Sequence, residues 1–291
     1  MGHQIGARSS DLLDLGDCTG GIRRELSARY CSGAGWPRLR ADPACRPAGG
    51  VMGQVEVPVR WLLVLWDIDH TLVENHGVNK EIYAEAFELL TGRRAERRAE
   101  TDGRTEPEIM RNMLIAHGIE PTSDYLGRVT EALETATVGG VSRLRERGYE
   151  LPGARAALAK FQGMPGIAQS VLSGNIKANA YTKLSTFGLQ EYLDFEVGGY
   201  GSDDDVRAKL VGVAQRRASV KYGVNFGPDT TVLVGDTLRD VRAGLEGGAR
   251  VVGVASGSDS MEALLKEGAD AVLPDLRDTA AVVRAVTQFR D

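Results

Sequence analysis

Cysteine is nearly absent from this 291-residue chain. Its three cysteines, Cys18, Cys31 and Cys45, all lie near the N-terminus, and none belongs to a C-x-x-C pair. Their odd number and loose spacing argue against a disulfide framework and against a zinc site. A long sequence without cysteine is typical of a reducing compartment, so we expect a cytoplasmic protein.

Long apolar runs are also missing. No segment reaches the roughly 18 to 20 apolar residues of a membrane helix, and the first residues lack the apolar stretch of a signal peptide. The chain has no excess of positive charge, because 35 Lys and Arg face 40 Asp and Glu, a net charge of -5. Without a basic stripe we expect no nucleic-acid partner, and we expect no membrane partner. We expect a monomer or a homodimer.

Regular periodicity is lacking in residues 1–51, which are rich in Gly, Arg, Ala and Pro. Neither a helical nor a strand pattern persists there. We therefore expect a disordered or loosely ordered N-terminal extension. The alternative is a translation start assigned too far upstream, with Met52 as the first residue.

Short apolar runs alternate with helical patterns in the rest of the chain. Runs of this length, buried on both faces, are typical of parallel strands. Their alternation with helices predicts an α/β protein with a Rossmann-like, doubly wound parallel sheet. The predicted strands are Trp61–Trp66, Ile167–Leu172, Phe195–Val197, Thr231–Val234, Val251–Ala255 and Ala271–Leu273.

One long segment interrupts the alternation. Residues 76–151 have helical patterns and no clear strand, and Thr105 with Glu108 predicts a capping box at one helix start. We therefore expect a helical module inserted into an α/β core formed by residues 57–75 and 152–291.

Acidic and small polar residues follow the predicted strands. Asp67 and Asp69 come directly after the first strand, Ser173 and Gly174 after the second, and Asp236 after the fourth, with Asp240 one helical turn later. Taken singly, each has an ordinary explanation as a turn residue, an N-cap or a solvent-facing acid.

Taken together, these residues define a candidate site. In an open parallel sheet the carboxyl ends of the strands meet at one edge, where ligands bind. Four carboxylates in one crevice require a cation, and a set of oxygen ligands favours Mg²⁺. The serine hydroxyl and the free amides at the start of a helix are suited to phosphate.

The ordered motifs DIDHT, VLSGN, a basic residue and VGDTLRD make the chain similar to the haloacid dehalogenase (HAD) superfamily over about residues 57–291. The helical segment resembles the C1 cap of subfamily I, and within that group the chain resembles the phosphoglycolate phosphatase-like hydrolases. The resemblance implies Mg²⁺-dependent hydrolysis of a small phosphorylated metabolite through an aspartyl-phosphate.

The resemblance also implies roles. Asp67 would be the nucleophile and Asp69 the general acid and base. Thr71 would hydrogen-bond near the nucleophile and, with Ser173 and Gly174, bind the phosphate. The metal would be bound by Asp67, Asp236, Asp240 and the backbone carbonyl of Asp69. An acid at position 69 favours phosphate esters over haloacids, since an alkoxide leaving group needs a proton and a halide does not.

Two positions stay open. The basic residue is Lys209 or Arg207, with a slight preference for Lys209 from its spacing. Arg104, in the predicted cap, would bind a second anionic group of a substrate such as 2-phosphoglycolate, or is a surface residue at a helix entry. The alternatives to a phosphatase are a phosphomutase on the same fold and a non-catalytic regulatory protein.

Overall fold

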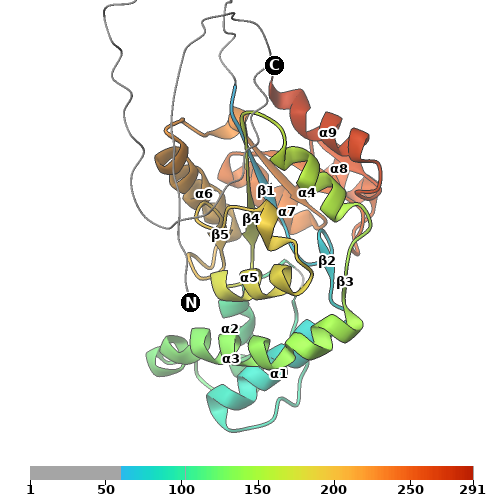
Figure 1. The fold of residues 1–291 in the computed structure, drawn as a ribbon. Helices are drawn as coiled ribbons and strands as arrows, with labels where there is room; N and C mark the ends of the chain where they lie inside the picture. The colour runs from blue at the N-terminus through green and yellow to red at the C-terminus, as the bar shows by residue number, and fades with distance from the viewer. Residues whose placement is uncertain (1–59, 102, 291) are drawn as a thin grey trace, which may run out of the picture. The chain divides into compact units, whose positions relative to one another are not determined.

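A six-stranded parallel sheet lies at the centre of the part of the chain that this computed structural model describes, residues 60–101 and 103–290. The predicted extension, residues 1–51, lies outside the described residues. The strands run in the order β5-β4-β1-β6-β7-β8, so the first strand is central, and both its neighbours come from later in the sequence (Figure 1). The bounds are β1 Leu62–Trp66, β4 Ile167–Ser173, β5 Gly199–Tyr200, β6 Thr231–Gly235, β7 Arg250–Val254 and β8 Ala271–Leu273.

The central strand β1 is buried along its whole length because helices cover both faces of the sheet. Alternate side chains of a strand point to opposite faces. Leu62, Val64 and Trp66 belong to one hydrophobic cluster, which includes residues of the helices α4 and α9. Leu63 and Leu65 belong to another, with residues of α6 and α7. The covering helices are α4 Ala154–Gln162, α5 Lys177–Thr186, α6 Arg207–Tyr222, α7 Leu238–Gly247, α8 Met261–Glu267 and α9 Thr279–Thr287.

Three of the helices between β1 and β4 form a group of their own: α1 Val78–Thr91, α2 Glu106–Ala116 and α3 Ser123–Arg147. They have a hydrophobic core of their own, with Phe87, Met110 and Leu133 among its fully buried residues. Thr105 caps α2 as predicted, since its side chain accepts a hydrogen bond from the Glu108 amide. The other half of the predicted capping box is not formed, because the Glu108 carboxylate pairs with Arg104. The three helices lie together beyond the carboxyl ends of the central strands (Figure 1). We call them the helical insert.

A short antiparallel pair of strands, which the sequence patterns did not reveal, joins the insert to the sheet. It consists of β2 Val73–Glu74 and β3 Tyr149–Glu150, and it lies where the chain leaves the sheet and returns to it. Strands of two residues have too few side chains for a periodic pattern.

The predicted strand Phe195–Val197 is wrong. Asp194 forms a turn at this position. Its carboxylate accepts a hydrogen bond from the Glu196 amide, and its carbonyl accepts one from the Val197 amide. The edge strand begins only at Gly199, so the apolar residues before it belong to a turn. The other five predicted strands are confirmed to within one residue at either end.

The described helices include none that is both long enough and apolar enough to cross a lipid bilayer.

Candidate active site

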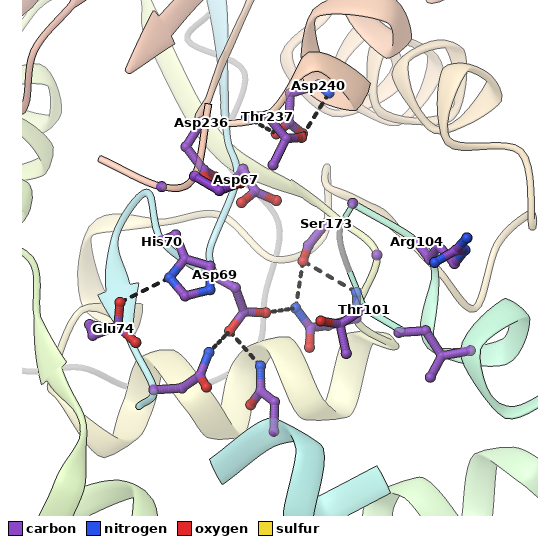
Figure 2. Close-up of a pocket in the computed structure, with 18 of the residues that line it drawn as sticks. Asp67, Asp69, His70, Glu74, Thr101, Arg104, Ser173, Asp236, Thr237 and Asp240 are labelled. Carbon is purple, nitrogen blue, oxygen red and sulfur yellow. Dashed lines mark hydrogen bonds and ion pairs between the residues drawn. The ribbon is translucent and has the colours of Figure 1, made fainter. Parts of the chain in front are cut away.

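Three strand ends converge on one pocket. The central strand β1 pairs in parallel with β4 on one side and with β6 on the other, so Trp66 lies level with Val171 and with Val234. The residues that follow these positions therefore reach the same edge of the sheet. The pocket at this edge is lined by Asp67, Asp69, Ser173, Gly174, Arg207, Asp236 and Asp240, and by residues of the insert (Figure 2).

The carboxylates of Asp67, Asp236 and Asp240 form the acidic centre of the pocket. Their oxygens lie within 4.8 Å of one another, and all three residues are buried. Asp240 is held by the start of α7, where its carboxylate accepts hydrogen bonds from the backbone and hydroxyl of Thr237 in a capping box. Figure 2 shows Asp236 and Asp67 side by side at the ends of their strands.

Arg207, the first residue of α6, neutralises part of this charge. Its guanidinium donates to Asp67 at 2.6 Å and also to Asp240, and only 10% of its side chain is exposed. Burial opposes the charged form, but these two aspartates outweigh burial and raise the pKa of Arg207. One cation therefore faces three buried carboxylates, and its Nε has no hydrogen-bond partner.

The excess of carboxylates shifts their titration. Burial, followed by repulsion from Asp240, raises the pKa of Asp67 to about 7 against the attraction of Arg207. Burial and repulsion from Asp67 likewise raise the pKa of Asp236 well above its ordinary value. Buried acids with like-charged neighbours have raised pKa values, because burial and repulsion both disfavour the ionised form.

Lys209, the preferred basic residue of the sequence analysis, lies elsewhere. Its side chain is 63% exposed and pairs with Asp204 at 3.1 Å. The helix α6 begins at Arg207, so its first residue is directed into the pocket, whereas Lys209 lies further along the helix at its solvent-exposed surface. The structure thus brings Arg207 to the site and does not bring Lys209.

Asp69 has surroundings opposite to those of Asp67. Its carboxylate accepts hydrogen bonds from Asn175 at 3.0 Å and Asn79 at 2.8 Å, and it contacts the Lys183 ammonium at 3.0 Å. Burial would raise its pKa, but Lys183 and the amides outweigh burial and lower the pKa of Asp69 to about 2. This carboxylate is therefore held in its ionised form.

The loop after β4 supplies neutral polar groups. The Ser173 hydroxyl accepts hydrogen bonds from the amide and side chain of Asn175, which leaves its own proton free to be donated. Gly174 lines the pocket beside it. The helix α5 starts three residues later, so its N-terminus faces the same edge.

Thr71 does not line the pocket. It is fully buried, and its hydroxyl donates to Asp236 at 3.0 Å. Its place is behind the acidic centre, where it orients one carboxylate. The predicted contact with phosphate does not agree with this position.

Arg104 does line the pocket, from the insert. Its guanidinium already pairs with Glu100 at 3.2 Å and with Glu108 at 3.3 Å. An anionic group of a substrate would have to compete with these two carboxylates. Arg104 therefore attracts an anion less strongly than an unpaired arginine would.

The insert touches the sheet at the loop after β4. The Glu106 amide donates to the Gly174 carbonyl at 2.7 Å, and a Cβ on Gly174 would lie 2.2 Å from the Arg104 carbonyl. The buried Glu106 carboxylate accepts hydrogen bonds from the Ile176 amide and from Asn179. A glycine at position 174 is what allows the two backbones to approach so closely.

The sequence analysis missed three residues that contact Asp69: Lys183, Asn175 and Asn79. Lys183 lies within α5, and from sequence a single lysine in a helix is expected to face solvent. Only the three-dimensional arrangement reveals that it reaches Asp69. Asn175 gave a partial signal, because it belongs to the same VLSGN motif as Ser173.

The acidic centre fits a divalent cation. Its donors are carboxylate oxygens, which hard cations prefer, and the described site contains one guanidinium against three acids. Burial and mutual repulsion raise the pKa values of two of these acids, and a cation between them would offset that repulsion. The residues present therefore could hold a metal ion.

Comparison with known proteins agrees with this geometry. Residues 61–248 match the family model of the haloacid dehalogenase-like hydrolases, and the chain belongs to that family. Members of this family are hydrolases that typically use a metal ion. A search of the curated proteins found no match.

Solved structures share the fold. A predicted phosphatase from Clostridium acetobutylicum is 15% identical with a TM-score of 0.55, covering 77% of this chain and 99% of that one. A predicted phosphoglycolate phosphatase from Haemophilus somnus is 14% identical with a TM-score of 0.54, covering 78% and 99%. A protein assigned provisionally as a β-phosphoglucomutase, from Bacteroides vulgatus, is 14% identical with a TM-score of 0.56, covering 80% and 91%. At such identities the likeness establishes the fold alone.

Proposed function

We propose that this protein is a Mg²⁺-dependent phosphatase that hydrolyses a small phosphomonoester through an aspartyl-phosphate. The observation that carries the proposal is the convergence of Asp67, Asp236 and Asp240 with Arg207 and Ser173 in one buried pocket. Phosphoryl transfer depends chiefly on positioning and on charge stabilisation, and this pocket supplies both.

Asp67 is the nucleophile in this scheme. One of its carboxylate oxygens attacks phosphorus, and the bond between phosphorus and the ester oxygen breaks. The Arg207 guanidinium, which already contacts this carboxylate, is placed to hold the phosphoryl oxygens together with the Ser173 hydroxyl and the Gly174 amide.

Asp69 transfers the proton. Its ionised carboxylate takes up a proton as the substrate binds and gives that proton to the departing alkoxide in the first step. In the second step it takes a proton from the attacking water, and this proton leaves with the product phosphate. The bond between phosphorus and Asp67 then breaks, which restores both aspartates. One proton thus passes through Asp69 in each step.

Asp67, Asp236 and Asp240 would hold Mg²⁺ together with the Asp69 carbonyl. The ion would neutralise charge, so that a carboxylate could approach a phosphate dianion. Thr71 and Thr237 would orient the carboxylates that bind it. These contacts support the proposed magnesium site.

The helical insert would act as a cap over the pocket and determine the substrate. Closed over the pocket, it would exclude bulk water during the first step. 2-Phosphoglycolate is the first compound to test, with Arg104 as the contact for its carboxylate. Because Glu100 and Glu108 already pair with Arg104, phosphate esters of uncharged alcohols should be tested beside 2-phosphoglycolate.

The test is phosphate release from a panel of phosphomonoesters by wild type and by Asp67→Asn, each with Mg²⁺ and with EDTA. We expect release that needs Mg²⁺ and falls by more than about 10³-fold in the variant, because the nucleophile is lost. No release from any ester by folded wild type in Mg²⁺ would overturn the proposal. Turnover that requires a sugar bisphosphate would instead identify a phosphomutase, and a protein inactive under every condition would point to a regulatory role.

A further inference from the structure

Lys183 is a buried charge outside the acidic centre. Only 1% of the residue is exposed, although it lies on α5, whose outer face meets solvent. Burying an ammonium group is costly unless partners replace its hydration. A lysine kept at such a position therefore has a specific set of partners.

These partners are one acid and one amide at the edge of the pocket. The ammonium lies 3.0 Å from one oxygen of Asp69 and 3.3 Å from the other, and it donates a hydrogen bond to the side-chain oxygen Oδ1 of Asn175. The Asn175 amide in turn donates to Asp69 at 3.0 Å and to the Ser173 hydroxyl at 2.7 Å. Lys183 and Asn175 thus hold Asp69 from the side of the sheet.

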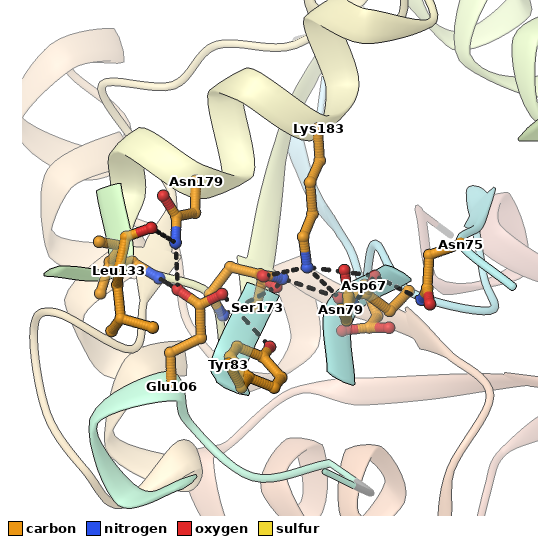
Figure 3. A network of polar contacts seen from close by, with 12 residues as sticks. Asp67, Asn75, Asn79, Tyr83, Glu106, Leu133, Ser173, Asn179 and Lys183 are labelled. Atoms are coloured by element: carbon orange, nitrogen blue, oxygen red, sulfur yellow. Dashed lines mark hydrogen bonds and ion pairs between the residues drawn. The ribbon is translucent and has the colours of Figure 1, made fainter. Parts of the chain in front are cut away.

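The insert holds the same carboxylate from the opposite side. Asn79, in the first turn of α1, donates to it at 2.8 Å, and Asn75, in the connection between β2 and α1, donates at 3.2 Å. Figure 3 shows Lys183 extending from its helix into this network, between Ser173 and Asn79. The carboxylate is therefore fixed by contacts on both of its oxygens.

Lys183 does not line the pocket, whereas Asp69, Asn75, Asn79 and Asn175 do. It consequently acts on Asp69 and has no contact of its own with a substrate. Its position behind the carboxylate leaves the pocket side of Asp69 open to an incoming water.

We propose that Lys183 is a positioning residue that holds the Asp69 carboxylate in place for the second step, the attack of water on the aspartyl-phosphate. This inference rests on the proposed phosphatase function. In that step the water oxygen bonds to phosphorus, the water proton moves to Asp69, and the bond from phosphorus to Asp67 breaks. A displaced carboxylate would no longer meet the water, and a misplacement of about 1 Å can cost about 10²-fold in rate.

The test variant is Lys183→Met, which keeps the length of the side chain and removes its charge. Lys177→Met is the matched control, since Lys177 lies on the same helix but is exposed and pairs with Glu196. With p-nitrophenyl phosphate, whose leaving group needs no proton, we expect Lys183→Met to release a burst of one nitrophenolate per active site. Steady-state turnover should then be about 10²-fold slower than in wild type, and mass spectrometry of acid-quenched protein should detect phosphate on Asp67.

Lys183→Gln gives a second measurement, because it retains a hydrogen-bond donor without a charge and should keep more turnover than Lys183→Met. Circular dichroism establishes that each variant is folded. The inference is overturned if Lys183→Met turns over like Lys177→Met, or if burst and steady state fall together in both Lys183 variants. If wild type is active and either of these outcomes is seen, only the role of Lys183 is overturned, and the proposed phosphatase function is kept. Wild type inactive toward every ester removes the function and the inference together.

Discussion

At the scale of single residues, two aspartates separated by one position have opposite surroundings. Asp67 lies among carboxylates, and its pKa is raised to about 7, while Asp69 lies among donors, and its pKa is lowered to about 2. Burial affects both, so the difference comes from their neighbours. Pairs of acids whose environments separate their pKa values are a frequent sign of divided catalytic roles.

Arg207 gives the first prediction at this scale. Replacing it with Met leaves Asp67 and Asp240 buried without their cation, and removing one partner of a buried ion pair destabilises a protein by about 3 to 5 kcal/mol. We expect Arg207→Met to lower the midpoint of urea unfolding without Mg²⁺, and to lower phosphate release by about 10²- to 10³-fold.

Lys209→Met is the matched control for Arg207. Its exposed pair with Asp204 is worth no more than about 1 kcal/mol, so stability and phosphate release should stay close to wild type. If Lys209→Met were the variant that lost activity, the assignment of Arg207 to the pocket would be wrong.

The sequence could identify the residues at the strand ends, since Asp67, Ser173 and Asp236 follow apolar runs that form adjacent strands. It could not choose between Arg207 and Lys209. Two residues on a helix start differ by about 200° in direction, and which one enters the pocket depends on where α6 docks. The contact between Lys183 and Asp69 could not be predicted for the same reason, because it depends on how α5 packs.

At the scale of elements, the contact between the insert and the loop after β4 is made by backbone. A Cβ on Gly174 would lie 2.2 Å from the Arg104 carbonyl. Real Cβ atoms do not approach so closely, so a side chain at position 174 must push the insert away from the sheet.

Gly174→Ala is therefore expected to separate α2 from the pocket. The hydrogen bond from Glu106 to the Gly174 carbonyl would weaken, and amide exchange in the first turns of α2 should increase. With Arg104 moved from the pocket, KM should rise several-fold more than kcat falls. The measurement is hydrogen exchange of α2 alongside steady-state kinetics.

Gly139→Ala is the control for this prediction. Gly139 lies on α3 with open space around it, so an alanine there should leave activity intact and stabilise the helix by up to about 1 kcal/mol. Unchanged exchange and KM in Gly174→Ala would mean that the backbone contact at the pocket is dispensable.

Sequence patterns predicted the long elements better than the short ones. β1 is where its apolar run predicted it, and α3 has 25 residues and lies within the segment 76–151 that was predicted to be helical. The pair β2 and β3 escaped because two-residue strands carry no period, and Phe195–Val197 was misread because the turn at Asp194 overrides apolar composition.

At the scale of the whole molecule, the acidic centre couples stability to pH and to metal. The folded pKa of Asp67 is about 7, above its ordinary value of 3.8, and that of Asp236 is raised as well. Below about pH 4 such groups are protonated in both the folded and the unfolded chain. Between about pH 4 and 7 the unfolded chain loses these protons first, so their contribution to stability declines as pH rises.

The contribution of Asp69 has the opposite sign. Its folded pKa of about 2 lies below its ordinary value of 3.8, so it contributes stability above about pH 4 and loses it only as pH falls toward 2. Between pH 5 and pH 8 the two raised aspartates therefore determine the trend that the site imposes.

We expect the Tm of the metal-free protein to fall between pH 5 and pH 8, and the fall to be smaller in Asp67→Asn, which removes one titrating group and one charge from the centre.

Mg²⁺ should raise the Tm of wild type more at pH 8 than at pH 5, since it binds the ionised carboxylates. A Mg²⁺ concentration of 100 Kd would add about 2.7 kcal/mol to the free energy of unfolding. Differential scanning calorimetry of wild type and of Asp67→Asn, each with Mg²⁺ and with EDTA, gives the Tm under all four conditions at each pH. Equal slopes with pH in wild type and variant would show that Asp67 is ionised throughout this range, and that the acidic centre holds its charge without a metal.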